Sequence, residues 1–388
     1  MRKKLPYSLV ARTIGNSVYI YYRYRRLDGT RSPLISTGVK AESPSAPDIA
    51  AAKRKANLIC LDLFSDDRLK QSSSMSIAEY TRNFFTDSCR YVQWKRSKGT
   101  EQHEGLTKST IAFYRTKLEQ QIIPYIGNLR LCDLTIKKCK SWVLELKRAG
   151  YSNKTINGAI GVMRIIRNQA MEDELITVDP LLNIGTFRVD KINKDLWTMN
   201  ELREMFREER WSNQSARLAA ILACCTGMRI GEIIALDASD IHDNYIDVTK
   251  NYDRKFGYGD VKTHSSRKIP LSQELRELVL VGPGLLFPGR KTAKTAGHPL
   301  GSDAIRSNLR AVMRQMGIDY KKRKLTFHAF RHFFNTYLEK SDINPNKIRA
   351  VMGHKDDSMT GLYTDWNAND FPEVFEKQKN LIRSILWQ

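Results

Sequence analysis

Two polar stretches without hydrophobic periodicity divide this 388-residue chain into three parts. Residues 66–75 run from charged residues into a row of serines, and residues 187–196 are again mostly polar or charged. Such stretches are typical of linkers because they offer no apolar face to a core. The chain is also longer than one typical domain. We therefore expect three domains, at 1–65, 76–186 and 197–388, joined by these two linkers.

The first part combines a β-rich stretch with one helix. β-forming residues at 17–24 and 31–38, separated by a turn that contains Gly29, predict antiparallel strands. Apolar residues at helical spacing predict a helix over 43–64, with Ser45 as its N-cap. Arginines on a sheet can enter a DNA groove, although they can also simply keep a surface soluble. The candidates for DNA contact are Arg23, Arg25 and Arg31.

The second part is helical throughout. Its apolar periodicity predicts helices over 76–95, 107–122, 135–149 and 153–172, and a short one near 174–178. Short helices of this kind form a bundle around a shared apolar core. Basic residues on them are candidates for a DNA-binding face, with a solvated outer surface as the alternative. They are Lys137, Lys138, Lys140, Arg164 and Arg167.

The third part places an arginine at a junction between two apolar helices. A helix predicted over 217–225 is broken at Gly227, and Arg229 follows at the start of the next apolar helix. A buried charge without a partner is costly, and Glu232 is the candidate partner. Two interpretations stay open: a structural ion pair, or a guanidinium directed at a phosphate.

A predicted hairpin at 245–271 supplies a candidate lysine. The stretch alternates between polar and apolar residues, carries a glycine-bearing turn at FGYGD, and has Lys262 shortly after that turn. The alternatives, because they are near in sequence, are Lys250, Lys255 and Lys268.

Two short motifs near the C-terminus carry the remaining chemistry. His328 and Arg331 are three residues apart and share a face of a predicted helix, and His354 precedes Tyr363 by nine residues. A tyrosine with a pKa near 10 is only about 0.1% phenolate at neutral pH, so it needs a base and cations to attack. The same cations would stabilise negative charge on a phosphoryl group. The set favours metal-free attack by Tyr363 on a phosphodiester.

A metal site is the competing interpretation of the histidines. His328 and His332 are four residues apart, but the sequence has no HExxH motif and no cysteine or carboxylate ligands at short spacing. We therefore expect neither a metal nor another cofactor.

The charge balance indicates a polyanionic partner. Lysine and arginine number 64 against 42 acidic residues, a formal charge of +22, and all three parts are net positive. Nucleic acid is the usual polyanion. The chain shows no secretory signal and no apolar run of bilayer length, and its six cysteines form no CxxC pair. We expect a cytoplasmic protein with free, mostly buried thiols and no membrane partner.

Five motifs taken together resemble those of the tyrosine recombinases, specifically the phage-type integrases. They are TGMRIGE, VKTHSSRKIPL, HAFRHFFNT, VMGH and the tyrosine nine residues after the histidine of VMGH. The resemblance is strong over 197–366. Residues 76–185 resemble the family's core-binding domain, and the N-terminal sheet and helix resemble the arm-type DNA-binding domain of many integrases. It implies a multidomain, mainly α fold with small antiparallel sheets: a small sheet plus helix, a central helical bundle and a mixed α/β catalytic domain.

The resemblance also implies a role for each candidate residue. Tyr363 would attack the scissile phosphate, leaving a 3′-phosphotyrosine and a free 5′-hydroxyl. Arg229 and Arg331 would clamp the non-bridging oxygens. The other implied roles are proton acceptor for His328, phosphate donor for His354, proton donor to the 5′-oxygen for Lys262 and support for Glu232. Phe330, Val351 and Met352 depart from the residues most common in the family, and we expect no effect on the chemistry.

The implied partner is double-stranded DNA at core sites and arm sites, bound by a homotetramer, with accessory DNA-bending or directionality proteins. The amphipathic segment 371–387 would dock on a neighbouring subunit, or else pack on its own domain. One alternative function is a topoisomerase of type IB, which the two N-terminal parts and the tail argue against. The other is a catalytically silent DNA-binding regulator, which the complete set of six catalytic positions argues against.

Overall fold

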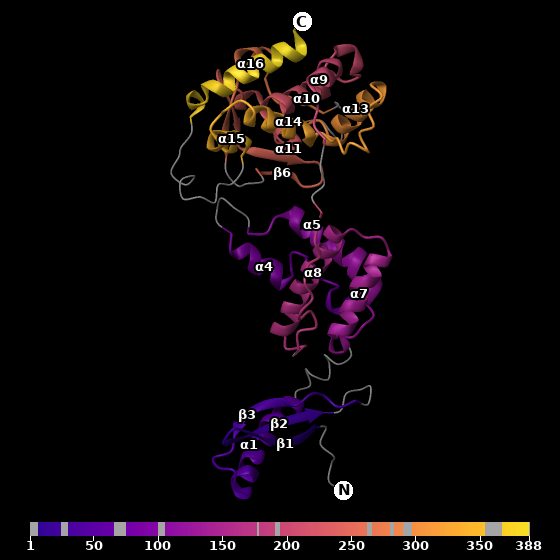
Figure 1. The fold of residues 1–388 in the computed structure, drawn as a ribbon, viewed down its shortest axis with the longest axis vertical. Helices are drawn as coiled ribbons and strands as arrows, with labels where there is room; N and C mark the ends of the chain where they lie inside the picture. Colours follow the sequence, from indigo (N-terminus) through magenta and orange to yellow (C-terminus); the bar gives the residue numbers. More distant parts are fainter. Residues whose placement is uncertain are drawn as a thin grey trace. The chain divides into compact units, whose positions relative to one another are not determined.

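The computed structural model describes residues 7–24, 30–65, 75–99, 105–176, 178–190, 195–261, 266–279, 283–289, 297–353 and 367–387. They form two compact units, the first built from described residues up to Val189 and the second from described residues from Asp190 onward (Figure 1). No helix in these described ranges is long and apolar enough to cross a membrane. The mainly helical fold with small antiparallel sheets is the one predicted.

The N-terminal sheet consists of β1 (Tyr7–Ile14), β2 (Ser17–Tyr24) and β3 (Ile35–Lys40), antiparallel in the order β1-β2-β3. Helix α1 (Ala46–Ser65) packs on the face that carries Val18 and Ile20. Ser45 caps α1 as predicted, since the Asp48 amide donates to its Oγ at 3.4 Å. The third strand was predicted from residue 31 but begins at Ile35, beyond Pro33, which has no N–H to give to a strand ladder.

The helical part of the first unit has its own hydrophobic cluster, separate from that of the N-terminal sheet. Its elements are α3 (Ile77–Tyr80), α4 (Arg90–Ser97), α5 (Lys108–Lys117), the π-helical η1 (Leu118–Ile122), α6 (Ile123–Ile126), η2 (Leu131–Asp133), α7 (Ile136–Arg148) and α8 (Asn153–Glu172). The predicted helices over 135–149 and 153–172 are confirmed within a residue by α7 and α8.

The predicted helix over 76–95 is wrong, because two short helices occupy this stretch. The Thr86 hydroxyl donates to the Asn83 carbonyl at 2.7 Å, and Phe85, fully buried, adopts a φ of 60°. Short polar side chains compete in this way with the helical ladder. The short helix near 174–178 is likewise absent from the residues described there, since the chain turns at Glu174, whose φ is 58°.

The second unit combines its helices with two small antiparallel sheets, β4–β7 and β5–β6. Its helices are α9 (Met199–Met205), η3 (Glu208–Arg210), α10 (Gln214–Thr226), α11 (Ile230–Ile234), η4 (Ala238–Asp240), α12 (Gln273–Val279), α13 (Ser302–Gln315), α14 (His328–Glu339), α15 (Pro345–Met352), η5 (Ala368–Asp370) and α16 (Pro372–Leu386). Its strands are β4 (Tyr245–Val248), β5 (Lys250–Asp253), β6 (Gly257–Asp260) and β7 (Arg267–Pro270). The turn expected at FGYGD lies just before it, and Gly257–Asp260 form β6.

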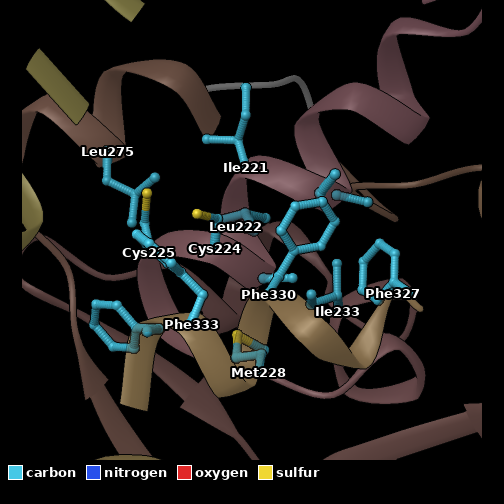
Figure 2. Close-up of a cluster of buried hydrophobic side chains, with 14 of the residues drawn as sticks. Ile221, Leu222, Cys224, Cys225, Met228, Ile233, Leu275, Phe327, Phe330 and Phe333 are labelled. Atoms are coloured by element: carbon cyan, nitrogen blue, oxygen red, sulfur yellow. The ribbon is translucent and has the colours of Figure 1, made fainter. Parts of the chain in front are cut away.

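The core of this unit lies between α10 and α14. Figure 2 shows buried side chains of α10 beside Phe330 and Phe333 of α14. Phe330 is fully buried and stacks on Trp197, with ring centroids 5.4 Å apart. Phe330, one of the positions that depart from the common family residues, therefore has a packing partner. All six cysteines are free and four are buried, as predicted.

The C-terminal helix α16 packs on its own unit. It contacts α9 and α12, and its residues Val374, Leu381 and Ile382 are buried. Gln378, also fully buried, accepts a hydrogen bond from the Ser272 amide at 2.9 Å and donates one to the Pro270 carbonyl at 2.7 Å. The single chain thus buries the apolar face of its tail helix internally, and docking on a neighbouring subunit stays a prediction.

Candidate active site

The site begins where α10 ends. Gly227 closes α10 with a φ of 67°, a left-handed conformation that favours glycine. A Cβ on Gly227 would lie 2.6 Å from the Met352 sulfur, so the position also needs a residue without a side chain. The reversal sets Arg229 at the N-terminus of α11, as the sequence predicted.

One fully buried carboxylate organises the arginines around it. Glu232 Oε1 lies 2.8 Å from Arg229 Nη1, and Glu232 Oε2 accepts the Arg229 amide at 2.8 Å. Arg267, on β7, binds the same carboxylate with both terminal nitrogens, Nη1 at 3.2 Å and Nη2 at 2.8 Å. The Glu232 side chain has no exposed area, whereas Arg229 keeps 21% of its side chain exposed. Arg229 is therefore the partner that retains access to a ligand.

The electrostatics of Glu232 follow from these contacts. Burial alone would raise the pKa of its carboxyl group, but the hydrogen bonds and charge of Arg267, followed by the hydrogen bonds of Arg229, lower the pKa to about 2. Glu232 is therefore ionised at neutral pH and does not serve as an acid.

Arg331 lies on α14 and is buried among backbone carbonyls. Its Nη1 donates to the Gly227 carbonyl at 2.7 Å, and its Nη2 donates to the Met352 carbonyl. Burial, and then the charges of Arg229 and Arg267, lower the pKa of Arg331 to about 9. The second of these causes is a local excess of positive charge that an added anion would relieve.

The end of α15 is tied to the same group. Arg267 Nε donates to the Val351 carbonyl at 3.1 Å, next to the Met352 carbonyl that Arg331 binds. Gly353 ends α15 with a φ of 62°, and a Cβ there would meet the Arg267 guanidinium at 3.0 Å. Val351 and Met352, whose identities we expected to leave the chemistry unaffected, thus support the site through their backbone.

His328 is the first residue of α14 and is exposed, one turn before the buried Arg331. Its ring meets the His332 ring edge to face, with centroids 4.7 Å apart. Among the residues that the structure describes, no group of three or more His, Cys, Asp or Glu side chains could hold a metal ion. Three of the predicted catalytic residues lie outside the described residues: Lys262, His354 and Tyr363.

Arg267 was not among the predicted site residues, yet it binds both the Glu232 carboxylate and the Val351 carbonyl. The sequence did carry a signal for it. Arg267 lies two residues before Ile269, which is fully buried, so both side chains point to the same face of β7. An arginine that alternates with a core residue requires a buried anionic partner.

The predicted DNA contacts differ in what surrounds them. Arg23 lies on β2 and is partly buried, and Arg31 is exposed, whereas Arg25 is outside the described residues. Lys137 and Lys140 are exposed on α7, and Lys138 is partly exposed there. Arg164 donates to the Ile184 carbonyl at 2.6 Å and Arg167 pairs with Asp179. These two arginines therefore tie α8 to the segment that follows it.

The described residues define a class of site: three neighbouring guanidinium groups, two bonded to one carboxylate and the third to backbone carbonyls, with an exposed histidine at the start of the helix that carries the third. Such a cluster binds a tetrahedral anion through charge-assisted hydrogen bonds, and phosphate is the matching anion.

The comparisons with known proteins identify a family whose chemistry fits such a site. The model of the phage integrase family matches residues 197–370. Tyrosine recombinase XerD of Staphylococcus epidermidis is 25% identical over 287 residues, which cover 70% of this chain and 92% of that protein. XerD of Halalkalibacterium halodurans is 26% identical over 288 residues, 70% of this chain and 91% of that protein.

Solved structures share the fold. A lambda integrase dimer bound to a COC′ core site covers 95% of this chain and 98% of that chain, with a TM-score of 0.57 and 19% identity. The Tn1549 transposon integrase in complex with a circular intermediate DNA covers 79% of this chain and 100% of that chain, with a TM-score of 0.56 and 20% identity. The family match covers residues 197–370, the part that carries the arginine cluster, and this part identifies the protein as a tyrosine recombinase that acts on DNA.

Proposed function

We propose that this protein is the integrase of a mobile element, which cuts and rejoins double-stranded DNA through a 3′-phosphotyrosine at Tyr363. The observation that carries the proposal is the charge ratio of the cluster: Arg229 and Arg267 bind the single carboxylate of Glu232, and the nearby Arg331 adds a third positive charge that no second carboxylate of the described residues balances there. The scissile phosphate supplies the further anion that the cluster favours, and the charge that develops in the transition state strengthens the interaction.

The remaining roles follow the chemistry of each group. Arg229 and Arg331 clamp the non-bridging oxygens, His328 accepts the tyrosine proton, and His354 donates to the phosphate. Lys262 protonates the 5′-oxygen that leaves; of its rivals, Lys250 pairs with Asp240 at 2.9 Å and Lys268 lies over the Tyr245 ring. The covalent intermediate conserves the phosphodiester bond energy, so that rejoining uses neither ATP nor a metal.

On DNA the protein acts as a homotetramer at core sites, with residues 1–65 bound to arm sites and residues 76–186 to the core-site duplex. It works in the cytoplasm, together with accessory DNA-bending or directionality proteins. Two observations support this arrangement. The first is that the lambda integrase tetramer bound to a Holliday junction shares the fold over 94% of this chain, with a TM-score of 0.57. The second is that the N-terminal sheet presents cations on its open face.

That open face lies opposite α1. The strand register pairs Tyr19 of β2 with Arg12 of β1 and with Lys40 of β3. Tyr21 and Arg23 follow Tyr19 at intervals of two residues on β2, so their side chains lie on the same face. Rings between cations on the open face of a sheet suit a phosphate backbone, since arginine and lysine bind the phosphates and tyrosine supplies rigid contact area. We place the arm-site contacts here, and include Arg25 and Arg31 in the adjoining connection.

The test is a nicked suicide duplex that carries the attachment site, from which the downstream strand diffuses away after cleavage. An SDS-resistant protein–DNA adduct is expected, formed equally well in EDTA and abolished by Tyr363→Phe. Absence of an adduct on a site that the protein binds would contradict the proposal. An adduct accompanied by relaxation of supercoils but by no strand exchange would indicate the type IB topoisomerase instead.

A further inference from the structure

Arg267 holds together three elements that come from distant parts of the sequence. Its two terminal nitrogens donate to the Glu232 carboxylate on α11, and its Nε donates to the Val351 carbonyl in the last turn of α15. Only 8% of its side chain is exposed. All three donor nitrogens of the guanidinium are therefore occupied within the protein, which distinguishes Arg267 from Arg229.

The two contacts of Arg267 have different consequences. The fork on Glu232 fixes both carboxylate oxygens, and Glu232 in turn holds the guanidinium and the backbone amide of Arg229. The bond to Val351 holds the α15 carbonyl that precedes the one bound by Arg331. Two arginines on different elements thus secure consecutive carbonyls, immediately before the Gly353–His354 step in the sequence.

The surrounding chain is shaped for this contact. Gly353 lies against the guanidinium, and a Cβ there would come within 3.0 Å of three Arg267 side-chain atoms. A lysine could not replace the arginine, because it offers one nitrogen where three are used in a fixed plane.

We propose that Arg267 is a positioning residue for DNA strand cleavage: it holds Arg229, through Glu232, and the last turn of α15 in the geometry that receives the scissile phosphate. This inference rests on the proposed cleavage by Tyr363. Arg267 does not touch the DNA. Its effect is preorganisation, since a small misplacement of the clamping groups lowers the rate of the chemical step without weakening binding.

The first experiment measures single-turnover adduct formation on the suicide duplex, together with the affinity for the same duplex. Arg267→Gln is expected to lower the cleavage rate by about 10- to 100-fold and to change the affinity by less than about threefold. Arg276→Gln is the matched control, because it makes the same substitution at a half-exposed ion pair with Asp243 in the same unit. It is expected to cleave at the wild-type rate.

Two further readouts separate positioning from a general loss of structure. If Arg267 acts partly through Glu232, the loss in Arg267→Gln/Glu232→Gln is smaller than the sum of the losses in the two single variants. The acid limb of the cleavage-rate profile should also move to higher pH in Arg267→Gln, because the Glu232 carboxylate then keeps only Arg229 as a direct partner, with the Arg331 charge nearby. Arg267→Lys, which keeps the charge, should fold normally and still cleave slowly.

Each outcome has a definite meaning. Wild-type cleavage in both Arg267→Gln and Arg267→Lys would overturn the inference, as would additive losses in the double variant or a loss of affinity as large as the loss of rate. If Arg267→Gln does not fold, the Arg267→Lys rate and profile decide alone. Failure of the wild-type protein to form any adduct would instead refute the proposed function, which keeps the two failures distinct.

Discussion

Gly227 shows how one residue without a side chain determines the geometry of the arginines. Its positive φ ends α10, its carbonyl accepts from Arg331, and its Cα hydrogens face the Met352 sulfur. A larger residue would disturb the turn and the Arg331 contact at the same time. Strain and collision are separable here, because the chain contains another left-handed glycine in open space.

Gly227→Ala and Gly317→Ala provide that separation. Gly317 has a φ of 69° and no atom within 4 Å of an added Cβ, so its substitution should cost only backbone strain, about 1–2 kcal/mol. Gly227→Ala should cost about 1–3 kcal/mol more, because Met352 must move, and it should also slow adduct formation. Denaturant unfolding of both variants measures the difference. Equal losses would show that Met352 yields freely.

Glu232 gives the site a defined dependence on pH. Its pKa of about 2 in the folded protein lies below the ordinary value of 4.5, so its stabilising contribution is complete above pH 4.5 and is lost as the pH falls toward 2. The shift corresponds to about 3 kcal/mol. The stability difference between the wild type and Glu232→Gln should therefore be largest at neutral pH and shrink between about pH 4.5 and 2.

The free energy of unfolding measured from pH 2 to 7 checks this. Glu376→Gln is the control, since its carboxylate lies 3.9 Å from Lys379 on the surface and should contribute little at any pH. A difference between the wild type and Glu232→Gln that stays constant with pH would show that folding leaves the pKa of this carboxyl group at its ordinary value.

At this scale the sequence predicted the Arg229–Glu232 pair because both residues lie in one turn of helix. It did not identify Arg267, whose partners lie 35 and 84 residues away. Alternation gives the face of a strand, but only the assembled fold gives the group that this face meets. The positions of Lys262, His354 and Tyr363 in space are still predictions.

Among the secondary-structure elements, α16 was predicted as a helix from the sequence, but the surface that it covers was not. The pattern of residues 371–387 predicted an amphipathic helix, but a hydrophobic face does not say which surface it will cover. What distinguishes the observed packing is Gln378, a polar residue on the buried face with one donor and one acceptor partner at the end of β7 and the start of the next turn. Between helices α3 and α4 the apolar periodicity predicted one continuous helix, but polar side chains there interrupt it.

Gln378→Ala tests whether α16 belongs to its own unit. The change leaves the Ser272 amide and the Pro270 carbonyl buried without partners, and should cost about 1–3 kcal/mol. Asn380→Ala, on the exposed face of the same helix, should change stability by less than about 0.5 kcal/mol. Chemical denaturation at several protein concentrations measures both. A loss that depends on concentration would show that α16 is exchanged between subunits.

For the whole molecule, the charge of +22 is distributed over all three parts of the chain, whereas the core is divided into three hydrophobic clusters. Each part thus has a hydrophobic cluster of its own and a net positive charge. Composition gives the positive charge of each part, and the division into three domains stays a prediction. Neither indicated which cations face the nucleic acid, because this depends on which side of the N-terminal sheet α1 covers.

The open face of that sheet can be tested against the covered side with equal changes of charge. The triple variant Arg12→Gln/Arg23→Gln/Lys40→Gln should weaken binding to arm-site duplex. A plot of the logarithm of the binding constant against the logarithm of the salt concentration should become shallower by up to about 2.7. Each of the three lost phosphate contacts reduces the number of counterions that binding releases by about 0.9. Lys53→Gln/Arg54→Gln/Lys55→Gln on α1 removes the same charge from the opposite side and should leave the slope nearly unchanged. Equal slopes in the two triple variants would mean that net charge alone, rather than the sheet face, holds the DNA.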